Sequence, residues 1–196
     1  MAKDTLLTLT QKVLSSIDSD PVDSITDTLE SLDIAWLIRD VYFDITNNLD
    51  VPEHNELLTL TALADSTRPT HMQIPDDVTS IKEIRYDVIQ SGETKLNYDP
   101  IHYVEPQEFL RRTTGRDSTD STTTIVTITG AKLFVRNDTA PTYYTSFDDN
   151  FLIFDAHDSD VDSTLQASKF MVWGIKEPTF TMSDTFVPDL DTNLFP

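Results

Sequence analysis

The first fifty residues carry hydrophobic side chains at the spacing of α-helices. In the first segment the apolar positions recur at intervals of three and four residues, which places them on one helical face: Leu6, Leu9, Val13 and Ile17. Asp4 precedes this segment and is expected to cap the helix. A second, longer helix is expected to start at a capping box formed by Ser24 and Asp27 and to run to about Asn48.

The second half of the longer helix is apolar on more than one face. Its hydrophobic residues are Ile34, Ala35, Trp36, Leu37, Ile38, Val41, Tyr42, Phe43 and Ile45. A single packing partner covers one stripe of a helix rather than most of its circumference. We therefore expect this helix to pack between a sheet and another helix, and the second partner could come from a neighbouring subunit.

After residue 55 the pattern changes to short, partly alternating apolar segments that predict strands. The expected strands cover residues 56–63, 79–90, 94–98, 124–129, 132–135, 143–144, 150–154 and 169–175. Pro106 opens a short helix over residues 106–112. Gly130 is expected at the first central position of a type II′ turn in the hairpin 124–135.

Residues 181–196 fit neither a helical nor a strand period. Apolar side chains stand here among prolines and aspartates, which is typical of an extended arm that docks on its own domain or on a partner. The chain is thus expected to have an α+β fold, in which a helical bundle element packs with an antiparallel β-rich part and an extended C-terminal arm. The predicted parts of this one continuous unit are a helical hairpin (1–50), the β-rich part (51–180) and the arm (181–196).

The composition excludes several classes of protein. The 196 residues include 34 acidic and 14 basic ones, for a formal net charge of −20, and no cysteine. Disulfides, zinc–thiolate sites and thiol nucleophiles are therefore excluded. The four glycines are isolated from one another, which excludes dinucleotide-binding and P-loop motifs. No signal peptide or membrane-spanning segment is expected. The negative net charge argues against a protein that binds nucleic acid through its phosphates.

Some carboxylates and histidines could carry chemistry. His102 and Glu105 are a weak candidate for a metal site. Asp158, Asp160 and Asp162 alternate as ligands do in a calcium loop. An EF-hand would need glycine and glutamate at the positions of Ser163 and Lys169, so the sequence allows only a less regular calcium site. Paired carboxylates of a glycoside hydrolase also stay open, since a chain with 34 acids offers many pairs. No cofactor is expected.

Two segments resemble a known family. The first contains Pro141, Tyr143, Tyr144, Phe147, Asp148, Asp149 and Asn150, followed by the apolar run 151–154. The second contains Phe180, Met182, Asp184, Phe186, Val187, Pro188, Asp189, Leu190 and Asp191 and ends at residues 194–196. Together with residues 13–20 and the long helix that follows, the chain resembles the head-to-tail adaptors of short-tailed bacteriophages, also called the head-completion or tail tubular protein A type.

The resemblance implies a non-enzymatic virion protein at the head–tail junction, assembled in the host cytoplasm. Such adaptors form a ring of about twelve copies that joins the portal protein of the capsid to the tail nozzle protein. Double-stranded DNA passes through the lumen without specific binding, and no membrane is involved. The acidity then suits a channel wall or an exposed ring surface. Family members usually continue into a further long helix after the segment that matches Asp189 to Pro196, whereas this sequence stops there.

Candidate interface residues follow from these patterns. Trp36, Leu37 and Tyr42 are expected in bundle or subunit packing, and the docking arm is expected to use Phe186, Val187, Pro188, Leu190 and Phe195. Arg111, Arg112 and Arg116 form the one dense basic group, which could pair with the acidic surface of a neighbouring copy or face water. The alternatives are a tail-associated glycan hydrolase that uses carboxylates and a calcium-stabilised tail binding module.

Overall fold

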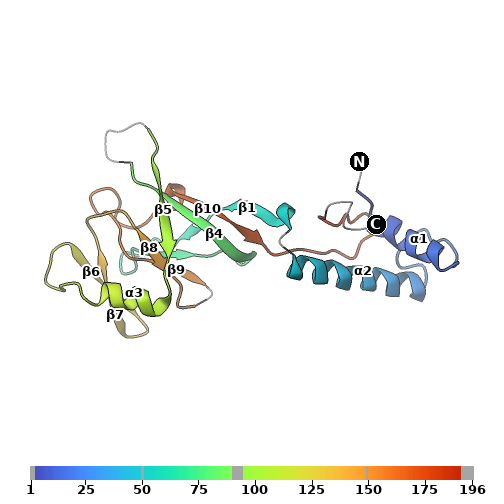
Figure 1. Ribbon diagram of the computed structural model, residues 1–196, viewed down its shortest axis with the longest axis horizontal. Coiled ribbons are helices and arrows are strands. Elements are labelled where there is room, and N and C mark those ends of the chain that lie inside the picture. Colours follow the sequence, from blue (N-terminus) through green and yellow to red (C-terminus); the bar gives the residue numbers. More distant parts are fainter. Residues whose placement is uncertain (1–2, 50, 90–94, 149, 191–196) are drawn as a thin grey trace. The chain divides into compact units, whose positions relative to one another are not determined.

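A computed structural model describes residues 3–49, 51–89, 95–148 and 150–190 (Figure 1). The chain divides into two compact units. We call Met1–Asn55 with Glu177–Pro196 the helical unit, and Glu56–Lys176 the sheet unit. The C-terminal segment from Glu177 thus belongs with the N-terminal helices. The α+β fold class is confirmed by the helix pair and the strand-rich remainder.

The helical unit contains α1 (Leu6–Ser16), α2 (Leu29–Asn48) and the short 3-10 helix η1 (Pro52–His54). Both predicted caps are wrong by a few residues. Thr5 rather than Asp4 caps α1, since its side chain accepts a hydrogen bond from the backbone N–H of Thr8 at 3.2 Å. The capping box of α2 is formed by Thr28 and Ser31.

Asp27 closes a turn ahead of α2 instead of capping it. Its carboxylate accepts backbone N–H bonds from Asp23 at 2.8 Å and Ser24 at 2.7 Å. Ser24 and Thr28 offer the same hydroxyl acceptor to a helix end, so local chemistry alone does not choose between the two starts. The choice falls to packing, because Ile25 is buried against α1 before the helix begins.

The C-terminal segment completes the helical unit by packing along its helices. Phe180, Met182 and Phe186 pack against the buried apolar face of α1 and α2, which is formed by Leu6, Leu14, Val22, Ile25, Ile34, Ala35 and Ile38. The carbonyl of Phe186 accepts a bond from Leu6 N–H at 2.7 Å, and that of Asp184 accepts one from Leu7 N–H at 3.3 Å. These bonds satisfy donors that the first turn of a helix leaves free.

The sheet unit is built on eight strands in the order β1-β10-β4-β5-β8-β9-β3-β2. Their bounds are β1 Asn55–Leu58, β2 Thr61–Ala62, β3 His71–Gln73, β4 Val78–Asp87, β5 Tyr98–Tyr103, β8 Tyr143–Thr145, β9 Phe151–Phe154 and β10 Phe170–Lys176. One core cluster joins Leu58 of β1, Met72 of β3 and Val172 of β10, so the sheet curves around its buried face.

The sheet is mixed rather than purely antiparallel. β5 and β8 pair in parallel, with Tyr103 opposite Tyr144. A parallel pair needs a long crossover, and residues 104–142 supply it with α3 (Pro106–Thr113) and a separate hairpin of β6 (Thr123–Ile128) and β7 (Ala131–Arg136). The predicted return strand 94–98 is also misplaced, because β5 begins only at Tyr98 and residues 95–97 are not in a strand.

The crossover packs as a small layer of its own, with α3 beside β7 (Figure 1). Phe109 of α3 is buried against Val126, Leu133 and Val135 of the hairpin. The predicted helix start at Pro106 is confirmed. The predicted type II′ turn is wrong: Thr129 (φ 46°) and Gly130 (φ 89°) both have positive φ, which defines type I′ and places glycine second.

Candidate interaction surfaces

One face of α2 exposes large apolar side chains that its own unit does not cover. Trp36 is 43% exposed, Leu37 59% and Val41 42%. Asp33, Asp40 and Asp44 are exposed on the same face. Each turn of the helix therefore presents an aspartate beside an apolar residue. The opposite face is buried, with Ile34, Ala35, Ile38 and Tyr42 inside the unit. The mixed exposed face is the first candidate surface, which we call the α2 face.

Arg39 fixes the edge of the α2 face. Its guanidinium carbon lies 4.9 Å from the centroid of the Trp36 ring and 5.5 Å from that of Phe43. Its Nη1 atom is 3.9 Å from the carboxylate of Asp40. A cation–π contact at an exposed site contributes about 0.5–1 kcal/mol, so Arg39 favours the observed orientation of the Trp36 ring.

Tyr42 lies inside the helical unit. It is fully buried, and its ring centroid lies 5.4 Å from those of both Phe43 and Phe180. Its hydroxyl is 3.5 Å from Nε2 of His54. Burial, and to a lesser extent the charge of Asp189, raises the pKa of Tyr42. Of the three predicted residues on this helix, Tyr42 serves bundle packing and the other two remain open to a partner.

The described part of the C-terminal arm packs mainly on its own unit. Pro188 and Leu190 are buried, and Leu190 contacts Tyr42 and Val51. Phe186 is partly buried, whereas Val187 is 39% exposed. Phe195 lies outside the described residues. The docking groove expected for this arm is therefore found in the same chain, and Val187 is the predicted arm residue that stays accessible within the described stretch.

The arginines of α3 are exposed but engaged within the chain. Glu108 binds Nη2 of Arg111 at 2.7 Å and Nε of Arg112 at 2.8 Å. The Arg112 guanidinium also stacks 4.3 Å from the centroid of the Tyr143 ring. Hydrogen bonds from Arg112 and Arg111 lower the pKa of Glu108. The two arginines are therefore accompanied by one carboxylate within the same helix.

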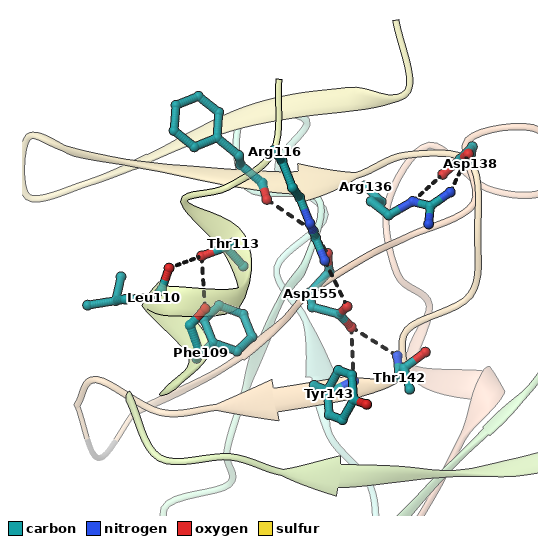
Figure 2. Close-up of polar contacts among 10 residues, drawn as sticks. Phe109, Leu110, Thr113, Arg116, Arg136, Asp138, Thr142, Tyr143 and Asp155 are labelled. Atoms are coloured by element: carbon teal, nitrogen blue, oxygen red, sulfur yellow. Dashed lines mark hydrogen bonds and ion pairs between the residues drawn. The ribbon is translucent and has the colours of Figure 1, made fainter. Parts of the chain in front are cut away.

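Arg116 does not belong to that exposed group. Its guanidinium donates hydrogen bonds to the carbonyls of Phe134 and Asp155, at 3.0 and 2.6 Å, and to the Asp155 carboxylate. Figure 2 shows the Arg116 side chain directed toward Asp155. The other carboxylate oxygen of Asp155 accepts the backbone N–H groups of Thr142 and Tyr143, both at 2.9 Å. The network ties the segment after α3 to β7, β8 and β9, and its role is structural.

A second apolar surface lies on the outer face of the sheet and is missed by the sequence patterns. Leu57 of β1 and Met171 and Trp173 of β10 are exposed around a groove of about 330 Å³. An ion pair between Glu83 and Arg85 of β4, at 2.7 Å, forms its polar rim. The signal in the sequence is that residues 170–175 are apolar on both alternating faces, as in strands covered on two sides. We call this surface the sheet groove.

The sheet unit also has a cavity at each end of its strands. One of about 620 Å³ lies where β4 begins, between Ile74, Val78, Tyr103 and Leu152. The other, of about 520 Å³, lies where β4 ends and is acidic, because its lining includes Asp87, Asp99, Asp138 and Asp158 and one base, Lys169. Most of the charge in the second cavity is thus of one sign.

The alternating aspartates considered for calcium have partners within the chain. Asp158 accepts the backbone N–H of Asp160 at 3.0 Å, and Asp162 pairs with Lys169 at 2.8 Å. Across the described ranges, no three or more His, Cys, Asp or Glu residues are grouped so that they could hold a metal ion. Within those same ranges, no helix is long and apolar enough to cross a membrane.

Two surfaces, the α2 face and the sheet groove, are therefore the candidate functional features of this chain. Comparison with protein-family models and with curated proteins gave no match.

Proposed function

We propose that this chain is a non-enzymatic structural protein of a short-tailed bacteriophage virion. Copies of it form a ring of about twelve that joins the portal protein to the tail nozzle protein, and genome DNA passes through the lumen. The proposal rests on the resemblance described above and on the surfaces that the two units expose.

The observation that carries the proposal is that each unit exposes an apolar surface of its own. The helical unit exposes the α2 face, and the sheet unit exposes the sheet groove. Large apolar side chains that are grouped and exposed on one face of a folded protein mark interaction sites. A connector in a ring must contact identical neighbours and different partners, so it needs more than one such surface.

The charge distribution supports the same role. The helical unit has 15 acidic and 3 basic residues, a formal net charge of −12, and the sheet unit has 19 and 11, a net charge of −8. Both units repel phosphate, which lets DNA pass a wall without adhering to it. A protein that held DNA would instead cluster its lysines and arginines.

Within the described ranges, the carboxyl groups whose pKa is shifted do not favour the hydrolase alternative. Asp65, Glu108, Asp117 and Asp138 have lowered pKa values, caused mainly by hydrogen bonds from Thr67, Arg112, Thr119 and Arg136 respectively. The lowered pKa values keep these groups ionised to a more acidic pH than an ordinary carboxyl group. A glycosidase needs the opposite, a carboxylic acid whose pKa is raised by an apolar environment.

The test is the assembly state of the protein with and without the portal protein. Mass photometry and negative-stain class averages should show a ring of about twelve copies, seated on the portal when both are mixed. A chain that stays monomeric with the portal present would refute the proposal.

A matched pair of variants links the ring to the sheet groove. Met171→Ser with Trp173→Ser is expected to keep the fold, since both side chains are exposed, and to prevent ring formation. Leu96→Ser changes an apolar residue that is 60% exposed and lies outside both surfaces, and this variant should assemble as the native chain does. Far-UV circular dichroism checks the fold of each variant.

A further inference from the structure

The α2 face has a chemical pattern that restricts its partner. On a helix with 3.6 residues per turn, Asp33, Asp40 and Asp44 fall along the middle of the exposed arc. Trp36 lies on one side of this row, and Leu37 and Val41 lie on the other. A complementary surface must therefore place apolar groups beside positively charged ones.

The bases of the helical unit do not neutralise this row. Lys3 pairs with Asp189 at 3.3 Å, and Lys12 pairs with Asp4 at 2.5 Å. Arg39 lies over Trp36, and its distance of 3.9 Å to Asp40 makes a weak pair. The unit keeps its net charge of −12, so a cationic partner is favoured by the whole unit as well as by the row.

A second copy of the chain fits this face poorly. Pairing two α2 faces would bring three aspartates of one copy against three of the other, and like charges across an interface are strongly unfavourable. The α2 face could instead meet the exposed bases of α3 in a second copy. This contact would be weak, because Arg111 and Arg112 already share Glu108.

We propose that the α2 face binds a basic amphipathic segment of a partner protein. The inference rests on the proposed connector function, in which the chain contacts different proteins as well as copies of itself. Trp36, Leu37 and Val41 supply the apolar anchors, and Asp33, Asp40 and Asp44 pair with lysines or arginines that flank the apolar stripe of the segment. Tryptophan is one of the residues enriched in binding hot spots.

The experiment uses the full chain and a labelled synthetic helix of about 18 residues, or about five turns. Its leucines form one stripe and its other positions are mostly lysine. Fluorescence anisotropy is expected to show saturable binding that weakens when salt rises from about 0.1 M to about 1 M, because the Debye length falls from about 10 Å to about 3 Å. A helix of the same composition with its leucines dispersed should bind at least about tenfold more weakly.

Two sets of variants separate the apolar and the charged contributions. Trp36→Ser with Leu37→Ser is expected to weaken binding at least about tenfold, as loss of a hot spot does. Asp33→Asn, Asp40→Asn and Asp44→Asn together should weaken it and flatten its salt dependence. The matched control is Asp20→Asn, Asp76→Asn and Asp160→Asn, which removes the same charge from exposed positions elsewhere and should leave the affinity within about twofold of native.

Several results would overturn the inference. One is equal binding by the striped and the dispersed helix, which would indicate general attraction to an acidic protein. Another is native affinity in the Trp36→Ser, Leu37→Ser variant. A third is self-association of the native chain, seen in sedimentation, that this variant abolishes, because the occupant would then be a second copy.

The outcome is separable from the fate of the connector proposal. Rings that assemble on the portal without any binding of the striped helix would refute this inference alone. Binding of the striped helix by a chain that never assembles would uphold the α2 face and refute the connector.

Discussion

The guanidinium of Arg116 and the carboxylate of Asp155 form an ion pair inside the sheet unit, with 3.1 Å between Nη2 and Oδ2. The Arg116 side chain is 19% exposed and that of Asp155 is 10% exposed. Each group has further hydrogen bonds, from Arg116 to two carbonyls and to Asp155 from two backbone N–H groups (Figure 2). The pair therefore joins segments that are 39 residues apart in the sequence.

Removal of Arg116 should destabilise the sheet unit strongly. Arg116→Ala leaves Asp155 buried without its counter-charge, which typically costs about 3–5 kcal/mol in the free energy of unfolding. Urea denaturation followed by Trp173 fluorescence, in a Trp36→Phe background, reports on this unit alone because the chain has two tryptophans.

Arg136→Ala is the matched control. Arg136 forms a similar two-point pair with Asp138, at 2.8 and 3.0 Å, but the arginine is about half exposed. Exposed pairs contribute at most about 1 kcal/mol. Equal losses of unfolding free energy in the two variants would show that burial of the Arg116–Asp155 pair does not increase its contribution to stability.

Arg116 also illustrates where sequence reasoning ends. Its distance from Arg111 and Arg112 along the chain suggests one basic group, yet α3 ends at Thr113 and the next residues turn the guanidinium inward. Its partner, Asp155, is far away in sequence, and no local pattern identifies it. The same holds for Tyr42, which shares an apolar run with the exposed Trp36.

Periodic segments were predictable because their signal is local. Both long helices, the start of α3 and most strands lie where hydrophobic spacing places them. Caps and turns were not predictable in this way. Thr5 and Asp4 both offer an oxygen acceptor to the helix end, and Gly130 suits either a type I′ or a type II′ turn. The sheet groove depends on which strands become neighbours, and only the fold decides this.

His71 should make the stability of the sheet unit depend on pH. The side chain is buried, and burial, aided by the positive charge of Arg68, lowers the pKa of His71 to about 4. Asp148 and Asp65 act in the opposite direction but more weakly. Between the unfolded pKa of about 6.5 and pH 4 the unfolded chain binds the additional proton, so stability falls as the pH falls and the loss is complete below that window.

The expected loss attributable to His71 is about 3 kcal/mol between pH 7 and pH 4. It is measured as the difference in unfolding free energy between the native chain and His71→Leu, which cannot titrate at this position. His157, whose pKa burial also lowers, contributes in the same direction in both proteins and cancels. A pH-independent difference between the native chain and His71→Leu would contradict the expectation.

Gly174 should resist substitution. It sits at a register shift of β10 against β4, and a Cβ atom there would clash with the carbonyl oxygen of Ser80 and lie 2.6 Å from Cδ1 of Leu58. Overpacking of this kind typically costs about 1–3 kcal/mol, so Gly174→Ala should lower the urea midpoint of the sheet unit. Gly115→Ala is the control: its Cβ meets nothing within 4 Å, and its effect should stay within about 0.5 kcal/mol.

Leu190 should anchor the C-terminal arm to the helical unit. The side chain is 2% exposed and packs against Tyr42 and Val51. Leu190→Ala removes these contacts and leaves a cavity, at a typical cost of about 2–5 kcal/mol. Trp36 fluorescence in a Trp173→Phe background follows the helical unit, and protease cleavage within residues 177–190 reports release of the arm.

Val187→Ala tests the same arm at a position that the unit does not cover. Val187 is 39% exposed, so its truncation should change the unfolding free energy by no more than about 0.5 kcal/mol and leave cleavage at the native rate. Because both variants shorten one aliphatic side chain in the same segment, a difference between them measures the anchoring at Leu190. If the arm were cleaved at the same rate in both variants, the segment would be held by the hydrogen bonds that the Phe186 and Asp184 carbonyls accept from the start of α1.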